Sequence, residues 1–490
     1  MSIAGTLPDR VAEIMSRYNM LSPGGRLGVG VSGGADSVVL LHILAVLSRR
    51  AGFEVVALHV NHQLRQEESL ADELFVRALA KRLGLAVEVK RVKLPEAGNL
   101  EQNARTARQT FFREAMESLG LNGVVLGHTR SDQAETVLFR LLRGSGLAGL
   151  AGMRIATSDG LFRPLLTTSR AEVRNWAEGN GITWREDSSN QELRFRRNRL
   201  RLQVLPALAE RFNPNLEKTL AGTAELAQTE EEYWAERMDA LYPQISKRTS
   251  LASFLQVPKL TELHLAEQRR VIRRAVHELR GDLRSIDLDH IDGVLRICRS
   301  RHGHDRILIP GVDALRSFDV LRMTRSESSS QEERHYRIPL EPGAWQTLPF
   351  GAGKISVNWA DCGASDCVNF NKVEGTALER VELDGDQLSD SDVPPPLYVR
   401  NWQPGDEIHL PGQAAAKRLK FLFQEHRVLL WERKHWPVLL WKDEIVWVRR
   451  FGCSAKFKSS AGSRNVLTIS YRADAPDPEN LTRDLSLNPN

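Results

Sequence analysis

Short apolar runs alternate with longer amphipathic stretches between about residues 26 and 190. The short runs suit buried strands, and the longer stretches have the 3.6-residue period of a helix. Strands are predicted at residues 27–31, 55–60, 86–92 and 123–126. Helices are predicted at about residues 38–47, 69–83, 99–120, 132–142 and 169–181. This alternation predicts a doubly wound α/β domain, in which helices cover both faces of a parallel sheet. Its chemistry is expected at the carboxyl ends of the strands.

The pattern changes twice further along the chain. Residues 216 to about 322 are rich in Leu, Glu, Arg and Ala and predict a mainly helical connector. After a polar linker at 324–334, residues 336–472 show short strands, Gly and Pro turns and several Trp residues, which predicts smaller β-rich C-terminal domains. Trp431, Trp436, Trp441 and Trp447 are expected in their core. We therefore divide the chain into residues 1–215, 216–330, 336–472 and a polar tail, 473–490, predicted to be disordered.

Composition narrows the class of protein. A chain of 490 residues predicts two to four domains, and a net charge of +5 permits an anionic partner without requiring one. The four cysteines include no Cys-x-x-Cys pair, so neither a zinc ribbon nor a disulfide framework is supported. The longest apolar stretch, Val38 to Leu47, is too short to span a bilayer. We expect a cytoplasmic protein with no membrane segment.

The sharpest local motif joins the first predicted strand to the first helix. It consists of Ser32, Gly33, Gly34, Ala35, Asp36 and Ser37. The two glycines let backbone N–H groups approach an anion, and the helix N-terminus adds partial positive charge. Asp36 would repel a phosphate directly, so its expected role is to hold Mg²⁺ against the phosphates. The motif lacks the Gly-Lys-Ser/Thr ending of a Walker loop, which argues against ordinary γ-phosphate chemistry.

This loop resembles that of the N-type ATP pyrophosphatases, which bind the pyrophosphate of ATP while AMP is transferred to a substrate oxygen. Later segments narrow the resemblance to the tRNA(Ile)-lysidine synthetases. They are HVNHQLR (59–65), NARTAR (103–108), GHTRSDQAET (127–136), RLLRG (140–144), RPLL (163–166), EDSSN (186–190) and FRRNRLRLQVLP (195–206). The match is dense over residues 26–215. It is weaker around Arg400, residues 405–406, 417–420 and 445–448, and residues 414–416 and 450–452 depart from the family pattern.

The resemblance implies an enzyme that ligates free L-lysine to carbon 2 of the wobble cytidine in a CAU-anticodon isoleucine tRNA. ATP would adenylate the carbonyl oxygen, and the lysine amine would then expel AMP to form lysidine, which switches codon reading from AUG to AUA. ATP and Mg²⁺ are the implied cofactors. The tRNA and lysine are the implied partners, and a homodimer is left open.

The resemblance also suggests roles for residues near the strand ends. His59 and Asn61 are placed near the adenine or ribose, or serve as core polar groups. Asp132 and Glu135, three residues apart on one helix face, would receive the lysine ammonium groups or accept a proton. His128 would contact nucleotide or phosphate, or be structural, and Arg108 would pair with the lysine carboxylate or a phosphate.

Two basic clusters are candidates for tRNA contacts. The first contains five arginines within eight residues, with no acidic residue among them: Arg194, Arg196, Arg197, Arg199 and Arg201. Such a run suits a phosphate backbone, although it is also typical of a solvated face. The second is formed by Lys417, Arg418 and Lys420.

Three other functions fit the sequence less well. A tRNA thiolase delivers sulfur through cysteines or an iron–sulfur cluster, yet residues 1–297 contain no cysteine. An amidotransferase-type synthetase needs an ammonia source, and position 2 is Ser rather than a nucleophilic Cys. A non-enzymatic RNA-binding protein would have no need for Asp36, Asp132 and Glu135.

Overall fold

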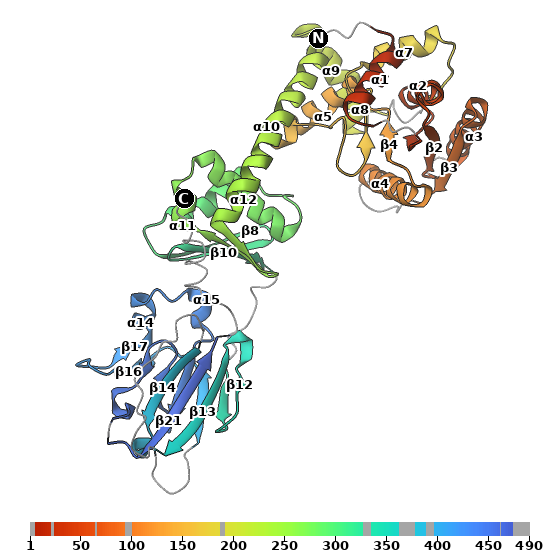
Figure 1. Cartoon of the computed structure of the whole chain (residues 1–490). Helices are drawn as coiled ribbons and strands as arrows, with labels where there is room; N and C mark the ends of the chain where they lie inside the picture. The colour runs from red at the N-terminus through yellow and green to blue at the C-terminus, as the bar shows by residue number, and fades with distance from the viewer. Residues whose placement is uncertain are drawn as a thin grey trace. The chain divides into compact units, whose positions relative to one another are not determined.

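The computed structural model describes residues 5–20, 24–63, 66–93, 100–186, 192–326, 335–361, 378–388, 396–460 and 462–473. They belong to two compact units, Met1–Ala235 and Glu236–Asn490 (Figure 1). Several predictions lie outside the described residues: the helix cap at Asn99, most of the 186–190 motif and all of the 473–490 tail after its first residue. The four-part domain division stays a prediction.

The first unit is built on a parallel sheet with strand order β3-β2-β1-β4-β5. Its strands are β1 (Arg26–Gly30), β2 (Glu54–Asn61), β3 (Ala86–Arg91), β4 (Gly123–Leu126) and β5 (Leu161–Phe162). The central strand β1 pairs with β2 on one side and β4 on the other. This confirms the predicted parallel sheet, and it places the segments that follow β1 and β4 side by side at the carboxyl edge.

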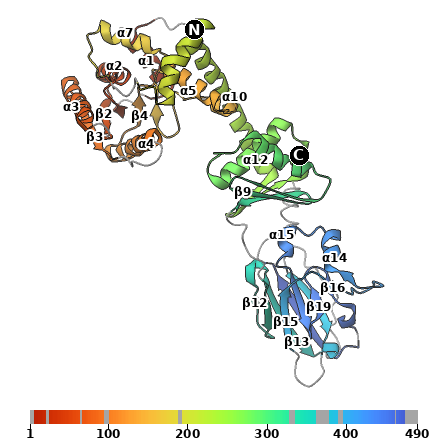
Figure 2. The same cartoon turned by 180° about the vertical axis from the view of Figure 1, so that it is seen from behind.

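Helices cover both faces of this sheet (Figures 1 and 2). Alternate residues of β2 show the two faces: Val55 and Ala57 pack with α1, α2, α3 and α7, whereas Val56 and Leu58 pack with α4. Successive side chains of a strand point to opposite faces of the sheet, which explains why neighbouring residues of β2 pack against different helices. The helices of this part of the chain are α1 (Leu7–Arg17), α2 (Ala35–Ala51), α3 (Gln66–Leu83), α4 (Leu100–Leu119), α5 (Arg130–Leu142), α6 (Leu147–Leu150), α7 (Arg170–Gly179), α8 (Arg196–Arg199) and α9 (Leu205–Arg211), with a π-helical segment η2 (Leu200–Val204) between α8 and α9. The long helix α10 (Leu216–Ile245) continues past Ala235, the last residue of the first unit.

The connector region contains a sheet that the helical pattern did not predict. An antiparallel sheet of order β6-β7-β10-β9-β8 accompanies the helices α11 (Val257–Glu262), α12 (Leu265–Arg280) and α13 (Leu288–Arg299). Its strands are β6 (Ser246–Arg248), β7 (Ala252–Gln256), β8 (His304–Ile309), β9 (Val312–Ser317) and β10 (Val320–Arg325). Charged residues such as Arg306 and Asp313 interrupt the apolar alternation in these strands. They pair across the strands at 2.8 Å, which lets a polar sequence form a sheet.

The C-terminal part is β-rich, as predicted. Two larger sheets have orders β11-β15-β18-β19-β20 and β12-β13-β21-β14, and β16 pairs with β17. The strands are β11 (Arg337–Leu340), β12 (Gln346–Thr347), β13 (Lys354–Asp361), β14 (Leu378–Asp384), β15 (Leu397–Asn401), β16 (Glu407–Ile408), β17 (Lys417–Arg418), β18 (Pro437–Trp441), β19 (Glu444–Val448), β20 (Gly452–Cys453) and β21 (Asn465–Arg472). The helices are α14 (Leu419–Glu425) and α15 (Leu430–Arg433).

Tryptophans fill the core of these C-terminal sheets. Trp436, Trp441 and Trp447 are buried, as the sequence predicted. Trp431 differs, because it is only partly buried and its ring lies 5.9 Å from that of Phe254.

Across the described parts of the chain, no helix is long and apolar enough to cross a membrane.

Candidate active site

The loop after β1 is shaped by its own serines and glycines. Ser37 Oγ donates to Gly34 O at 3.0 Å and accepts from Ser32 N at 3.2 Å, so the loop folds back on the first turn of α2. Gly33 has a φ of +97°, a conformation that other residues rarely adopt. The N-cap residue Gly34 offers no side chain to the first N–H groups of α2. These donors are therefore available for an anion.

Asp36 lies in the first turn of α2, and its carboxyl group is held in an unfavourable environment. Burial, followed by the negative charge of Asp132, raises the pKa of Asp36 to about 6. Its Oδ2 lies 3.6 Å from Arg170 Nε, whereas its buried Oδ1 has no hydrogen-bond partner among the residues described. A buried carboxylate with an unused oxygen beside an anion-binding loop is suited to a cation.

The end of β4 packs tightly against this turn. A Cβ added at Gly127 would lie 2.9 Å from the backbone carbonyl of Asp36, so no larger residue fits without a shift. Gly127 precedes the segment that leads into α5. This close approach is what brings the α5 carboxylates next to the phosphate loop.

Asp132 is part of the cap of α5. Its Oδ2 accepts hydrogen bonds from Thr129 N and Thr129 Oγ1, both at 2.8 Å, while its Oδ1 accepts from Arg170 at 2.7 Å and Arg201 at 3.2 Å. Burial alone would raise the pKa of Asp132, but the charge of Arg170 and the Thr129 hydrogen bond lower it. Asp132 is therefore held ionised.

Glu135, one turn further along α5, is surrounded by guanidinium groups. Its side chain is only 1% exposed and accepts from Arg201 Nε at 2.6 Å, Arg197 Nε at 3.2 Å and Arg170 at 3.2 Å. Asp132 and Glu135 thus share Arg170 and Arg201. The structure brings the two predicted carboxylates together, and both form ion pairs with arginines.

Arg170 was missed by the sequence analysis. It is the first residue of α7 and reaches Asp36, Asp132 and Glu135 together. Burial opposes its charge, yet these carboxylates raise its pKa above the ordinary value. A signal was present in the sequence, because a cation at a helix N-terminus opposes the helix dipole and needs a compensating partner.

The arginine run at 194–201 is not the uniformly unbalanced cluster expected from sequence. Arg197 and Arg201, four residues apart, both pair with Glu135. Arg194 pairs with Glu192, whereas Arg196 and Arg199 are exposed. The helical period of α8 and η2 separates the group in this way. A tRNA contact remains a prediction for all five residues, with Arg196 and Arg199 the better placed.

The remaining candidate site residues, at the ends of the strands, differ in whether other groups of the fold already bond to their side chains. Asn61 donates to Glu73 at 3.0 Å and to Ser69 O at 3.1 Å, so its amide is engaged within the fold. His59 Nδ1 lies 2.8 Å from Val31 O, and its Nε2 is buried without a partner in the described part of the chain. Burial lowers the pKa of His128 to about 4, so this histidine is neutral at pH 7.

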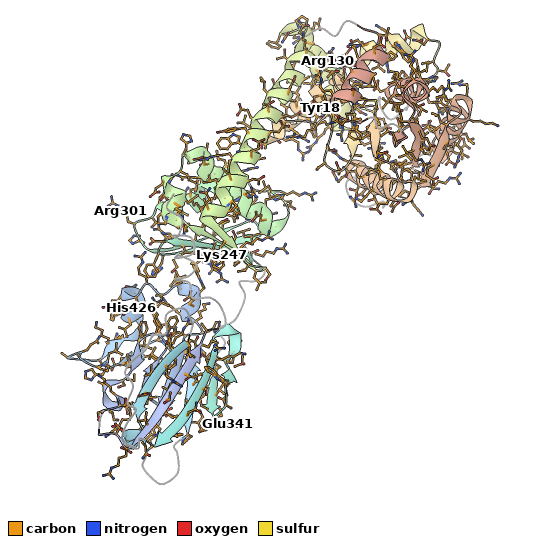
Figure 3. The ribbon with its side chains drawn as sticks, in the orientation of Figure 1. Tyr18, Arg130, Lys247, Arg301, Glu341 and His426 are labelled. Carbon is orange, nitrogen blue, oxygen red and sulfur yellow. The ribbon has the colours of Figure 1, made fainter. Side chains whose placement is uncertain are left out.

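A cavity opens beside the carboxylates. It has a volume of about 290 Å³, just below the usual range for ligand sites, which begins at about 300 Å³. Arg130, labelled in Figure 3, Glu135, Arg170 and Arg201 line one side. The other side is formed by residues of the 205–218 segment, among them Glu217, which accepts a hydrogen bond from Ser131 Oγ at 2.8 Å.

The second basic cluster belongs to the second unit. Lys417 is in β17 and pairs with Glu425 at 3.3 Å, whereas Arg418 and Lys420 are exposed. Nearby, Arg400 and Asp406 form a bidentate ion pair at 2.7 and 2.8 Å.

No group of three or more His, Cys, Asp and Glu side chains suited to a metal ion occurs within the described ranges.

Comparison with known proteins identifies the family. Residues 7–208 match the PP-loop domain, residues 255–321 the TilS substrate binding domain and residues 397–470 the TilS substrate C-terminal domain. The tRNA(Ile)-lysidine synthase of Solibacter usitatus is 42% identical over 454 residues, which cover 92% of this chain and 99% of the relative. The chain belongs to the tRNA(Ile)-lysidine synthase family. This membership makes it an enzyme with an ATP-binding PP-loop domain.

Other similarities are more distant. The tRNA(Ile)-lysidine synthase of Symbiobacterium thermophilum is 32% identical, covering 95% of this chain and 98% of the relative. Among solved structures, a U34-tRNA thiolase from Methanococcus maripaludis is 16% identical with a TM-score of 0.40, covering 45% of this chain and 77% of the thiolase.

Proposed function

We propose that this member of the tRNA(Ile)-lysidine synthase family ligates free L-lysine to carbon 2 of the wobble cytidine in CAU-anticodon isoleucine tRNA. The observation that carries the proposal is the 42% identity to a tRNA(Ile)-lysidine synthase over 92% of the chain. The site supports it, because an anion-binding loop, a cation-ready carboxylate and a pair of buried carboxylates meet at one edge of the sheet.

ATP is proposed to bind with its phosphates at the loop formed by residues 32–37. Asp36 suits a Mg²⁺ ion, because its Oδ1 is buried without a partner in the described region and its neighbour Arg170 is shared with Asp132 and Glu135. Mg²⁺ commonly combines one or two carboxylates with substrate phosphates. The bound ion would neutralise charge that develops on the phosphates.

The reaction then requires two displacements. The cytidine carbonyl oxygen attacks the α-phosphorus of ATP, and the bond to pyrophosphate breaks. An amine nitrogen of lysine next attacks carbon 2, and the carbon–oxygen bond breaks to release AMP. One proton leaves the attacking amine, and the proposal is that Glu135 or Asp132 receives it or holds a lysine ammonium group.

The surroundings of Asp132 favour one of these tasks. Asp132 is held ionised by Arg170 and by its cap to Thr129, which makes it a weak proton acceptor and a good ammonium ligand. Glu135 carries no cap and lines the 290 Å³ cavity, where an amino acid would approach it. Lysine must therefore compete with Arg170 or Arg201 for these oxygens.

The test is AMP formation from ATP with the isoleucine CAU transcript, in the presence or absence of each of the twenty amino acids. AMP release that requires both the tRNA and lysine is the expected result. A methionine tRNA transcript, which carries the same CAU triplet, is the matched control. Turnover indifferent to lysine would overturn the proposal, and tRNA binding without pyrophosphate release would favour a non-enzymatic RNA-binding protein.

A further inference from the structure

A second group of cations lies at the same sheet edge, and the mechanism above does not use most of it. Arg105 and Arg108 are exposed residues three positions apart on α4, and therefore on one face of that helix. Arg140 lies on α5, and Arg163 follows β5. Together with His62 and His128, at the ends of β2 and β4, these residues form what we call the α4 cluster.

The parallel sheet brings these residues to one edge, because His62 and His128 follow the two strands that flank β1, and α4 begins at the same edge after β3. Burial first, and then the charge of Arg105, lowers the pKa of both Arg140 and Arg163. Burial and the charge of Arg108 lower the pKa of His62 to about 4. Arg108 acts on His128 in the same direction. These charge effects agree with the shared position of the side chains at the carboxyl edge of the sheet.

Arg140 and Arg163, two members of the cluster, donate hydrogen bonds to backbone carbonyls. Arg140 donates to Gly149 O at 2.9 Å and Gly152 O at 3.2 Å, and Arg163 donates to Arg154 O at 2.9 Å. Carbonyls fix the guanidinium groups without cancelling their charge. Asp159 offsets part of the charge on Arg163.

Several buried polar nitrogens of the cluster also lack a hydrogen-bond partner in the part of the chain that the structure describes. Within the described residues, Arg163 Nε and the Nδ1 atoms of His62 and His128 are buried without a hydrogen-bond partner. Arg163 is itself only 8% exposed. A buried polar atom left without a partner is costly, and so is mutual repulsion between guanidinium groups. One anion would relieve both.

We propose that the α4 cluster binds a backbone phosphodiester of the substrate RNA next to the nucleotide that reacts. This inference rests on the proposed function. The phosphates of ATP have their own loop after β1. A lone carboxylate is satisfied by one bidentate arginine, whereas here several guanidinium groups and two neutral imidazoles lie at one edge of the sheet. The cluster also runs from exposed Arg105 to buried Arg163, as suits an extended polymer that enters from solvent.

The test measures the salt dependence of tRNA binding for Arg105→Gln, which removes an exposed charge. The slope of log affinity against log salt is expected to fall by about 1, and affinity to weaken severalfold for any tRNA sequence. Arg105→Lys should restore the slope. Arg113→Gln is the matched control, because it removes an exposed charge from the same helix outside the cluster.

Each outcome distinguishes the inference from the proposed function. An unchanged slope in Arg105→Gln overturns the phosphodiester site, even if the wild-type enzyme shows lysine-dependent AMP release. A raised KM for lysine with an unchanged slope would assign the cluster to the lysine carboxylate instead. If the slope falls as expected but the wild-type enzyme never releases AMP, the RNA site stands and the proposed reaction fails.

Discussion

The environment of Asp36 predicts that replacing this residue by Asn stabilises the first unit while it removes activity. Each pKa unit corresponds to about 1.4 kcal/mol, so a rise from 3.8 to about 6 costs the folded state about 3 kcal/mol when Asp36 is ionised. The side chain is 24% exposed, and solvent screening reduces that figure. We expect Asp36→Asn to gain about 1 to 2 kcal/mol at pH 8.

The expected gain in the stability of Asp36→Asn over the wild-type protein depends on pH. Because the folded-state pKa is raised, the folded wild-type protein binds the Asp36 proton more tightly than the unfolded chain does. The contribution of Asp36 to the stability of the wild-type protein is therefore most favourable below about pH 4 and becomes less favourable as the pH rises towards about 6. Asn resembles the protonated acid at every pH. The advantage of the variant should consequently disappear as the pH is lowered from about 6 to about 4.

Urea unfolding read by hydrogen-exchange labelling of peptides from β1 and β4 would measure this, because those peptides report on the first unit alone. Glu117→Gln, an exposed carboxylate on α4, is the control and should show no comparable gain. Turnover of Asp36→Asn should fall at least about 100-fold, since the proposed Mg²⁺ ligand is lost. A variant that is less stable at pH 8, or equally stabilised at pH 4 and pH 8, would refute the reasoning.

Two further perturbations test the geometry around Asp36. Glu135→Gln removes the buried carboxylate that pairs with three guanidinium groups. We expect it to destabilise the first unit by roughly 3 to 5 kcal/mol in the same unfolding assay. A loss below about 1 kcal/mol would contradict this ion-pair network. Gly127→Ala places a Cβ 2.9 Å from the backbone of Asp36 and should weaken ATP binding in calorimetry at a cost of about 1 to 3 kcal/mol, whereas Gly179→Ala, with open space around it, should not.

The sequence alone determined the architecture around the phosphate loop. Apolar runs of strand length, amphipathic stretches and glycine stops are local signals, because they depend on backbone geometry within a few residues. The same holds for the loop itself, since Gly33, Gly34 and the N-terminus of α2 act through adjacent backbone atoms. The spacing of Asp132 and Glu135 was likewise readable as one helix face.

The partners of these groups were decided only by the tertiary structure. Arg170 reaches Asp132 across 38 residues of sequence, and Arg201 reaches Glu135 across 66. No local pattern indicates which of five neighbouring arginines will find a buried carboxylate, so the run at 194–201 looked uniform in the sequence. The sheet of the connector was hidden for a similar reason, because its charged residues are neutralised by partners on the next strand. Local periodicity specifies elements, whereas pairing of charges depends on how those elements pack.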